Sequence, residues 1–186
     1  MSEELLLQHC SPTLAALKAG NMFSCPYGSM PMLEQTVQTW NARLNSKGVE
    51  ILILSKSSNT ALIYVYRPAL LAEELQKQES KDLLTTYGYP VDTPQASLSY
   101  LSDKLLQQGA FPHEIGLFLG YPSTDVRLFI ENKGCNGKCD GCWKVYANEL
   151  EAKQRFAQFK KCTALYIKKY KEGKPLDSLA VRKVSL

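Results

Sequence analysis

The sequence predicts an α+β fold: one domain in which a mainly antiparallel sheet of about four strands packs against helices. Two β-rich runs, residues 49–54 and 60–66, are separated by a short polar turn, and most other apolar residues recur at helical spacing. The chain has 186 residues, 45% of them hydrophobic, so it can bury its own core without disulfides. We therefore expect residues 1–186 to form a single domain, with residues 174–186 as a loose or docked C-terminal extension.

The part of the chain before the first β-rich run is predicted to be mostly helical. A short helix covers residues 3–8, and Ser11 with Pro12 starts a second helix that ends at Gly20. Residues 21–28 are predicted to form a loop. The third helix follows, and its apolar residues, spaced alternately by four and three positions, form one core-facing stripe of Leu33, Val37, Trp40 and Leu44.

The runs at 49–54 and 60–66 are predicted to form a β-hairpin. Both runs are almost continuously apolar, so we expect both faces of this sheet to be covered by helices. Arg67 directly follows the second strand. It is either a rim residue with a carboxylate partner or the cation of an anion-binding site, because a guanidinium suits both roles.

Beyond Arg67 the pattern predicts more helices and two short strands. Helices are expected over residues 68–78, 80–87 and 93–109, the last one ended by Gly109. Strands are expected over residues 115–119 and 143–146.

Two further helices complete the prediction. One is capped by Ser123 or Thr124 and runs to residue 131 or 132. The long final helix begins after Asn148, with Glu151 three positions later as in a capping box.

Charge and hydropathy exclude some classes of protein. The net charge is only +4, and much of the excess lies in residues 153–183, so a solvated basic helix face is favoured over a nucleic-acid surface. No apolar run approaches the roughly 18 residues that span a membrane. The apolar run near the N-terminus is too short for a signal peptide, so we expect a cytoplasmic protein without a membrane partner.

The cysteines provide the first functional hypothesis. Cys135, Cys139 and Cys142 are spaced as metal ligands often are, among three glycines that allow a tight loop. They could hold zinc or an iron–sulfur cluster, with a fourth ligand from elsewhere. This predicts a redox- or metal-linked accessory protein with a redox protein partner. The alternative is a flexible surface loop with reduced thiols.

A second hypothesis is a cysteine-dependent hydrolase or transferase. Cys10 is predicted to lie just before a helix N-terminus, where the helix dipole stabilises a thiolate. His113 would be the general base, and Glu114 would orient it. The alternatives are a buried Cys10, a His113 bonded to backbone, and a Glu114 paired with a lysine or arginine.

A third hypothesis is a binding module for a small ligand or a protein, without chemistry of its own. Its cleft would be lined by an arginine and three aromatic residues, namely Arg67, Tyr64, Tyr121 and Trp143.

The motifs also carry a family resemblance. PHEIGLFLGYP at 112–122, DVRLFIENKG at 125–134 and GCWKVY at 141–146 resemble the signature of the bacterial family called domain of unknown function 3793. HCSPTLAALKAGNMFS and LIYVYRPALL, nearer the N-terminus, also fit this family. The resemblance implies a protein typical of anaerobic bacteria and places His113 and Glu114 in its most specific motif. It implies no particular activity.

Overall fold

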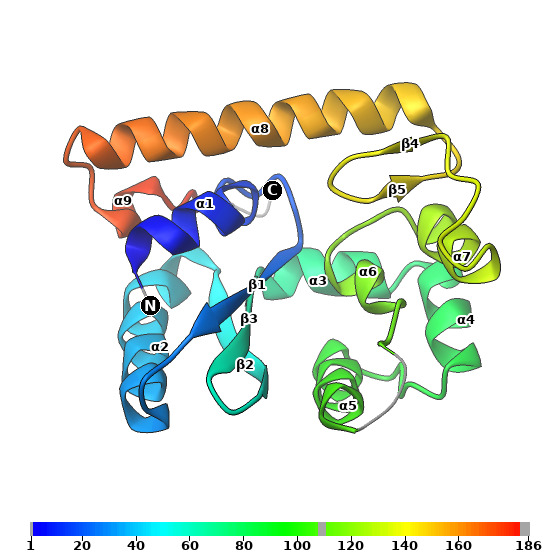
Figure 1. Cartoon of the computed structure of the whole chain (residues 1–186), viewed down its shortest axis with the longest axis horizontal. Helices are drawn as coiled ribbons and strands as arrows, with labels where there is room; N and C mark the ends of the chain where they lie inside the picture. The colour runs from blue at the N-terminus through cyan, green and yellow to red at the C-terminus, as the bar shows by residue number, and fades with distance from the viewer. Residues whose placement is uncertain (1, 108–110, 183–186) are drawn as a thin grey trace. The chain divides into compact units, whose positions relative to one another are not determined.

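The computed structural model describes residues 2–107 and 111–182 (Figure 1). The predicted helix end at Gly109 lies outside the described residues. The chain divides into two compact units: unit 1 comprises Met1–Leu70 and Lys161–Leu186, and unit 2 comprises Leu71–Lys160. Within the described ranges, no helix is both long and apolar enough to cross a membrane. The α+β class predicted from the sequence is confirmed, with a three-stranded and a two-stranded antiparallel sheet.

Unit 1 is built on the three-stranded sheet, in the order β1-β3-β2. The predicted hairpin is confirmed as β2 (Glu50–Lys56) and β3 (Thr60–Tyr66). The prediction of a loop over residues 21–28 is wrong, because β1 (Gly20–Pro26) pairs along its whole length with β3. This stretch contains Gly, Asn, Ser and Pro, which are uncommon in strands, so its local sequence does not indicate a strand. It is a strand because it pairs with the edge of β3.

Helices cover one face of this sheet (Figure 1). α1 (Glu3–Leu14) and α2 (Met30–Leu44) pack there, and the stripe predicted for α2 is confirmed as buried. The predicted break before Ser11 is wrong: α1 continues through Pro12, and the Ser11 hydroxyl donates to the Leu7 carbonyl. Pro12 has no N–H to donate to the carbonyl of Gln8, four residues earlier, so α1 lacks one of its helical hydrogen bonds there.

The opposite face of β3 carries two stacked tyrosines. Tyr64 and Tyr66 have ring centroids 4.8 Å apart and are both buried. Gly20 lies against this pair, because a Cβ there would be 2.4 Å from Cε2 of Tyr64. β3 is therefore buried on both faces, as its continuous apolar run predicts.

Arg67, which follows β3, binds three other segments of unit 1: the end of α1, the turn before β2 and the C-terminal extension. Its side chain is 2% exposed, and its guanidinium donates to the carbonyls of Thr13, Leu14, Lys47 and Val181. The first two belong to the last turn of α1, whose carbonyls have no partner within the helix. Burial lowers the pKa of Arg67. Neither sequence interpretation, a rim ion pair or an anion site, describes this guanidinium, whose bonds all go to the main chain.

The C-terminal extension is docked onto unit 1 as far as it is described. It contains α9 (Leu176–Leu179), and Leu176 and Ala180 are buried in the core of unit 1. The Val181 amide donates to the Leu14 carbonyl, beside the bond from Arg67 to the Val181 carbonyl.

Unit 2 is mainly helical. The prediction of a strand over residues 115–119 is wrong, because α6 (Ile115–Phe118) is a single helical turn. All four of its residues are buried, and a fully apolar run of this length has no periodicity that separates helix from strand. The other helices are α3 (Pro68–Leu75), α4 (Gln78–Thr86), α5 (Pro94–Leu106), α7 (Ser123–Glu131) and α8 (Glu149–Lys171), of which α3 and α8 run from one unit into the other.

The two-stranded sheet of unit 2 lies between α7 and α8 in the chain. The strand predicted over residues 143–146 is present in shorter form as β5 (Lys144–Val145), which pairs with β4 (Cys139–Asp140). At the start of α8 the Glu151 amide donates to the Asn148 side chain, as the predicted capping box requires, and the return bond comes from the side-chain amide of Asn148 to the Glu151 carboxylate.

The Arg67 clamp yields a stability prediction. Arg67→Met should lower the free energy of unfolding by at least about 3 kcal/mol, because four carbonyls, in two buried and two partly buried bonds, each lose a charged donor at about 1–3 kcal/mol. Arg43→Met is the matched control, since Arg43 is half-exposed and its pairs with Glu3 and Asp177 should be worth about 1 kcal/mol. Urea unfolding followed by circular dichroism measures both. Equal losses in the two variants would contradict the role given to Arg67.

Candidate ligand-binding cleft

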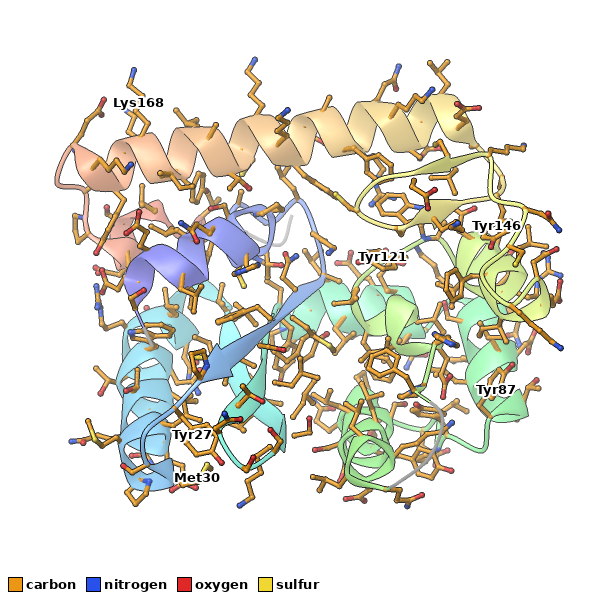
Figure 2. All side chains as sticks on the ribbon, in the orientation of Figure 1. Tyr27, Met30, Tyr87, Tyr121, Tyr146 and Lys168 are labelled. Atoms are coloured by element: carbon orange, nitrogen blue, oxygen red, sulfur yellow. The ribbon has the colours of Figure 1, made fainter. Side chains whose placement is uncertain are left out.

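Asp125 fixes the segment after β5 against α7. This residue is 3% exposed, and its carboxylate accepts hydrogen bonds from the Trp143 indole (2.8 Å) and from the amides of Tyr146 and Ala147 (2.9 Å each). Figure 1 shows β5 next to α7, and Figure 2 labels Tyr146 on the segment that follows β5. Three donors satisfy the buried carboxylate, and the bond from the indole N–H sets the orientation of Trp143.

Trp143 is held by aromatic contacts as well. Its ring centroid lies 5.2 Å from that of Tyr121 and 4.5 Å from that of Phe156, the latter edge-on. Gly141 makes this packing possible, because a Cβ there would be 2.1 Å from Cε2 of Phe156. Burial and the neighbouring Cys142 raise the pKa of Tyr121 to about 12. The indole of Trp143 is therefore held in one orientation and forms a wall, and the phenol of Tyr121 that packs against it is neutral.

A cleft of about 340 Å³ opens in front of this wall. It lies where α7 and α8 begin, with the end of α3 and the start of α4 on its other side. The polar and aromatic residues that line it are Glu74, Lys77, Glu79, Ser123, Thr124, Asp125, Trp143, Asn148, Glu151 and Arg155.

The N-terminus of α7 forms one side of the cleft. The prediction that Ser123 or Thr124 caps this helix is wrong: Pro122 is the N-cap and provides no side-chain bond. The Ser123 hydroxyl instead donates to the Glu79 carboxylate at 2.5 Å. Amides in the first turn of a helix have no acceptor within the helix, so this side of the cleft offers hydrogen-bond donors.

Arg155 supplies the cation of the cleft. Its guanidinium carbon lies 5.6 Å from the centroid of the Trp143 ring. Across the described ranges, Arg155 forms no ion pair, whereas Lys77, the other lining cation, pairs with Glu74 at 2.6 Å. A cation–π contact orients a guanidinium without using its hydrogen-bond donors, so those donors remain available to a ligand.

A second hollow of about 290 Å³ borders the cleft. It shares Glu79, Ser123 and Thr124 with the cleft and adds Asp82, with Leu83, Thr86 and Arg127. The bond between Ser123 and Glu79 therefore lies on the boundary of the two spaces.

The structure places Cys10 differently from the sequence prediction. Cys10 lies inside α1 rather than before a helix N-terminus, so the predicted helix-dipole effect on its thiolate is wrong. Its side chain is 0% exposed, and burial raises the pKa of its thiol far above the ordinary value. A catalytic role for Cys10 stays a prediction, without the electrostatic argument that suggested it.

His113 and Glu114 lie before α6 in unequal environments. His113 is exposed, with its ring edge-on to Phe129 at 5.0 Å. Glu114 is 3% exposed and accepts from Lys104 at 2.5 Å and from the Tyr89 hydroxyl at 3.0 Å. The alternative in which Glu114 pairs with a lysine is confirmed, and the catalytic roles of both residues stay predictions.

The three loop cysteines are accessible. Cys135 and Cys142 are exposed and Cys139 is partly buried, and all three are free thiols. Among residues 2–107 and 111–182, no three or more His, Cys, Asp and Glu side chains are grouped so that they could hold a metal ion. Metal binding by Cys135, Cys139 and Cys142 stays a prediction.

Of the residues predicted to bind a ligand, Trp143 lines the cleft and Tyr121 packs against it. Arg67 and Tyr64 belong to unit 1 and are buried there. Sequence reasoning missed Arg155, Glu79 and Asp125. In the sequence, Arg155 and Glu79 look like any other charged residue on a helix. Asp125 has a local signal, because it is an acidic residue in the first turn of a helix, but this signal suggests capping rather than burial.

The exposure of the cysteines predicts three classes of thiol reactivity. Cys135 and Cys142 should react rapidly with Ellman's reagent in the folded protein, and Cys139 more slowly. Cys10, Cys25 and Cys162 should react only after unfolding, because they are buried and burial raises the pKa of Cys162, for example, to about 11. All six thiols should titrate in urea. A fast phase of more than three thiols would contradict the burial described above.

The Asp125 network predicts a second stability effect. Asp125→Asn should cost about 2 kcal/mol, because the new amide group would point its hydrogens at one of the N–H donors. Asp140→Asn is the control, since Asp140 is 76% exposed and its pair with Lys144 should be worth less than about 1 kcal/mol. Urea unfolding measures both, and an Asp125→Asn variant as stable as the control would show that the network does not anchor Trp143.

Comparison with known proteins supports the resemblance seen in the sequence. The model of the family described as "Protein of unknown function (DUF3793)" matches residues 6–180, which is most of the chain. No curated protein and no solved structure matches it. This protein therefore belongs to the DUF3793 family.

Proposed function

We propose that the protein is a binding module for a small molecule with an anionic group, which it holds in the cleft of unit 2. The observation that carries the proposal is Arg155, a guanidinium that lines a cleft of about 340 Å³ and is oriented by Trp143 but has no ion-pair partner in the described residues. A guanidinium binds carboxylate and phosphate groups in two-point geometry, so it suits an anion at this place.

The walls of the cleft support a small rather than a macromolecular ligand. A volume near 300 Å³ is at the lower end for pockets that enclose small molecules. Trp143 provides a flat apolar surface, while Ser123, Thr124 and the first-turn amides of α7 provide donors. Such a combination of one apolar wall with a few polar groups is typical of small-ligand sites.

The other two functions have less support from the described geometry. A cysteine nucleophile needs an accessible thiolate, and the Cys10 thiol is buried with a raised pKa. The redox- or metal-linked function depends on Cys135, Cys139 and Cys142, and in the described part of the chain these do not belong to a metal-like group.

The proposal predicts that binding depends on Arg155. The protein should bind at least one of acetate, propionate, lactate, inorganic phosphate and glycerol phosphate in isothermal titration calorimetry. Arg155→Met should weaken that binding about tenfold or more, since a charged hydrogen bond is worth about 1.5–3 kcal/mol. Lys160→Met, which removes an exposed cation from the same helix, is the charge-matched control and should bind normally.

Two results would overturn the proposal. The first is that neither an anion of this panel nor β-alanine, which carries a carboxylate and an amine, binds the wild-type protein. The second is that Arg155→Met binds the best anion as tightly as Lys160→Met does. The melting temperatures of the two variants should be compared to establish that both are folded.

A further inference from the structure

The charges of the cleft are of both signs, and only some of them are paired with one another. Lys77 and Glu74 neutralise each other at 2.6 Å, and Asp125 is satisfied by its three N–H donors. Among the lining side chains this leaves the guanidinium of Arg155 and the carboxylates of Glu79 and Glu151.

Within residues 2–107 and 111–182, the two carboxylates have only neutral side-chain partners. Glu79 accepts from the Ser123 hydroxyl, and Glu151 accepts from the Asn148 amide at 3.1 Å. Neither of them forms an ion pair with any residue in the described ranges. Two carboxylates that face a cleft without a cation attract a positively charged group, and they repel a ligand that brings only negative charge.

We infer that the ligand is a small zwitterion, an amino acid or a related amino carboxylate. Its carboxylate binds Arg155 and its ammonium group lies toward Glu79 and Glu151. This inference rests on the proposed function and adds the cationic half of the ligand to it. A ligand with both charges complements all three groups at once, whereas a simple anion complements Arg155 alone and meets two like charges.

The neighbouring hollow supports this orientation. Glu79 lines both spaces, and the second one adds Asp82, a further carboxylate on the same side. A substituent near the ammonium group therefore has about 290 Å³ to enter, next to the carboxylates of Glu79 and Asp82. Arg127, the cation of that hollow, pairs with Glu131 at 3.3 Å.

Matched ligands test the inference directly. Titration calorimetry should compare glycine and β-alanine with acetate and propionate, which lack the amine, and with propylamine, which lacks the carboxylate. We expect the better amino acid to bind at least tenfold more tightly than its amine-free analogue and than propylamine. If propionate binds through Arg155 and β-alanine binds no better, the zwitterion is wrong while the proposed function stands.

Two isosteric variants test the carboxylates. Glu79→Gln and Glu151→Gln keep an acceptor for Ser123 and a capping-box residue for Asn148, so both should fold normally. The double variant should lower the affinity for β-alanine to that for propionate and should not weaken propionate. Glu34→Gln, an exposed residue of α2, is the control. If the double variant still prefers β-alanine to propionate as the wild-type protein does, the inference is overturned. If only Arg155→Met weakens the binding of β-alanine and propionate, the proposed function alone is supported.

Discussion

The buried carboxylate of Asp125 is the constraint on which the cleft depends. It accepts one bond from the indole of Trp143 and two from the main chain after β5, so a single side chain sets the position of the wall and of the segment that leads into α8. Because these neutral donors fully occupy it, Asp125 does not compete for the ligand. In the proposed function, the recognition chemistry is left to Arg155 and to the carboxylates of Glu79 and Glu151.

Each unit uses the same physical device, an ionised side chain buried among main-chain partners. In unit 1 the cation Arg67 collects carbonyls from α1, from the turn before β2 and from the C-terminal extension. In unit 2 the anion Asp125 collects amides. A buried charge without such partners would be costly, so both networks join segments that are distant in sequence and favour one arrangement of them. The first network organises the scaffold of unit 1, and the second organises the cleft of unit 2.

The sequence predicted those features that depend on local pattern. The stripe of α2, the hairpin of β2 and β3, and the capping box at Asn148 follow from spacing over a few residues, and the structure confirms them. β1 and α6 were predicted wrongly because their state is decided by tertiary partners. Of the candidate cleft, the sequence indicates Trp143 and Tyr121 by their chemistry. That Arg155 has no ion-pair partner among the described residues is a property of the three-dimensional arrangement, which no local pattern reveals.

The most direct measurement is a ¹H–¹⁵N spectrum of the indole N–H groups during titration with β-alanine. The chain has two tryptophans, Trp40 in the core of unit 1 and Trp143 in the wall of the cleft, so only two indole signals need assignment. The account predicts that the Trp143 signal moves with saturation and that the Trp40 signal stays in place. A Trp143 signal that does not move, while β-alanine binds by calorimetry, would place the ligand elsewhere and contradict the account.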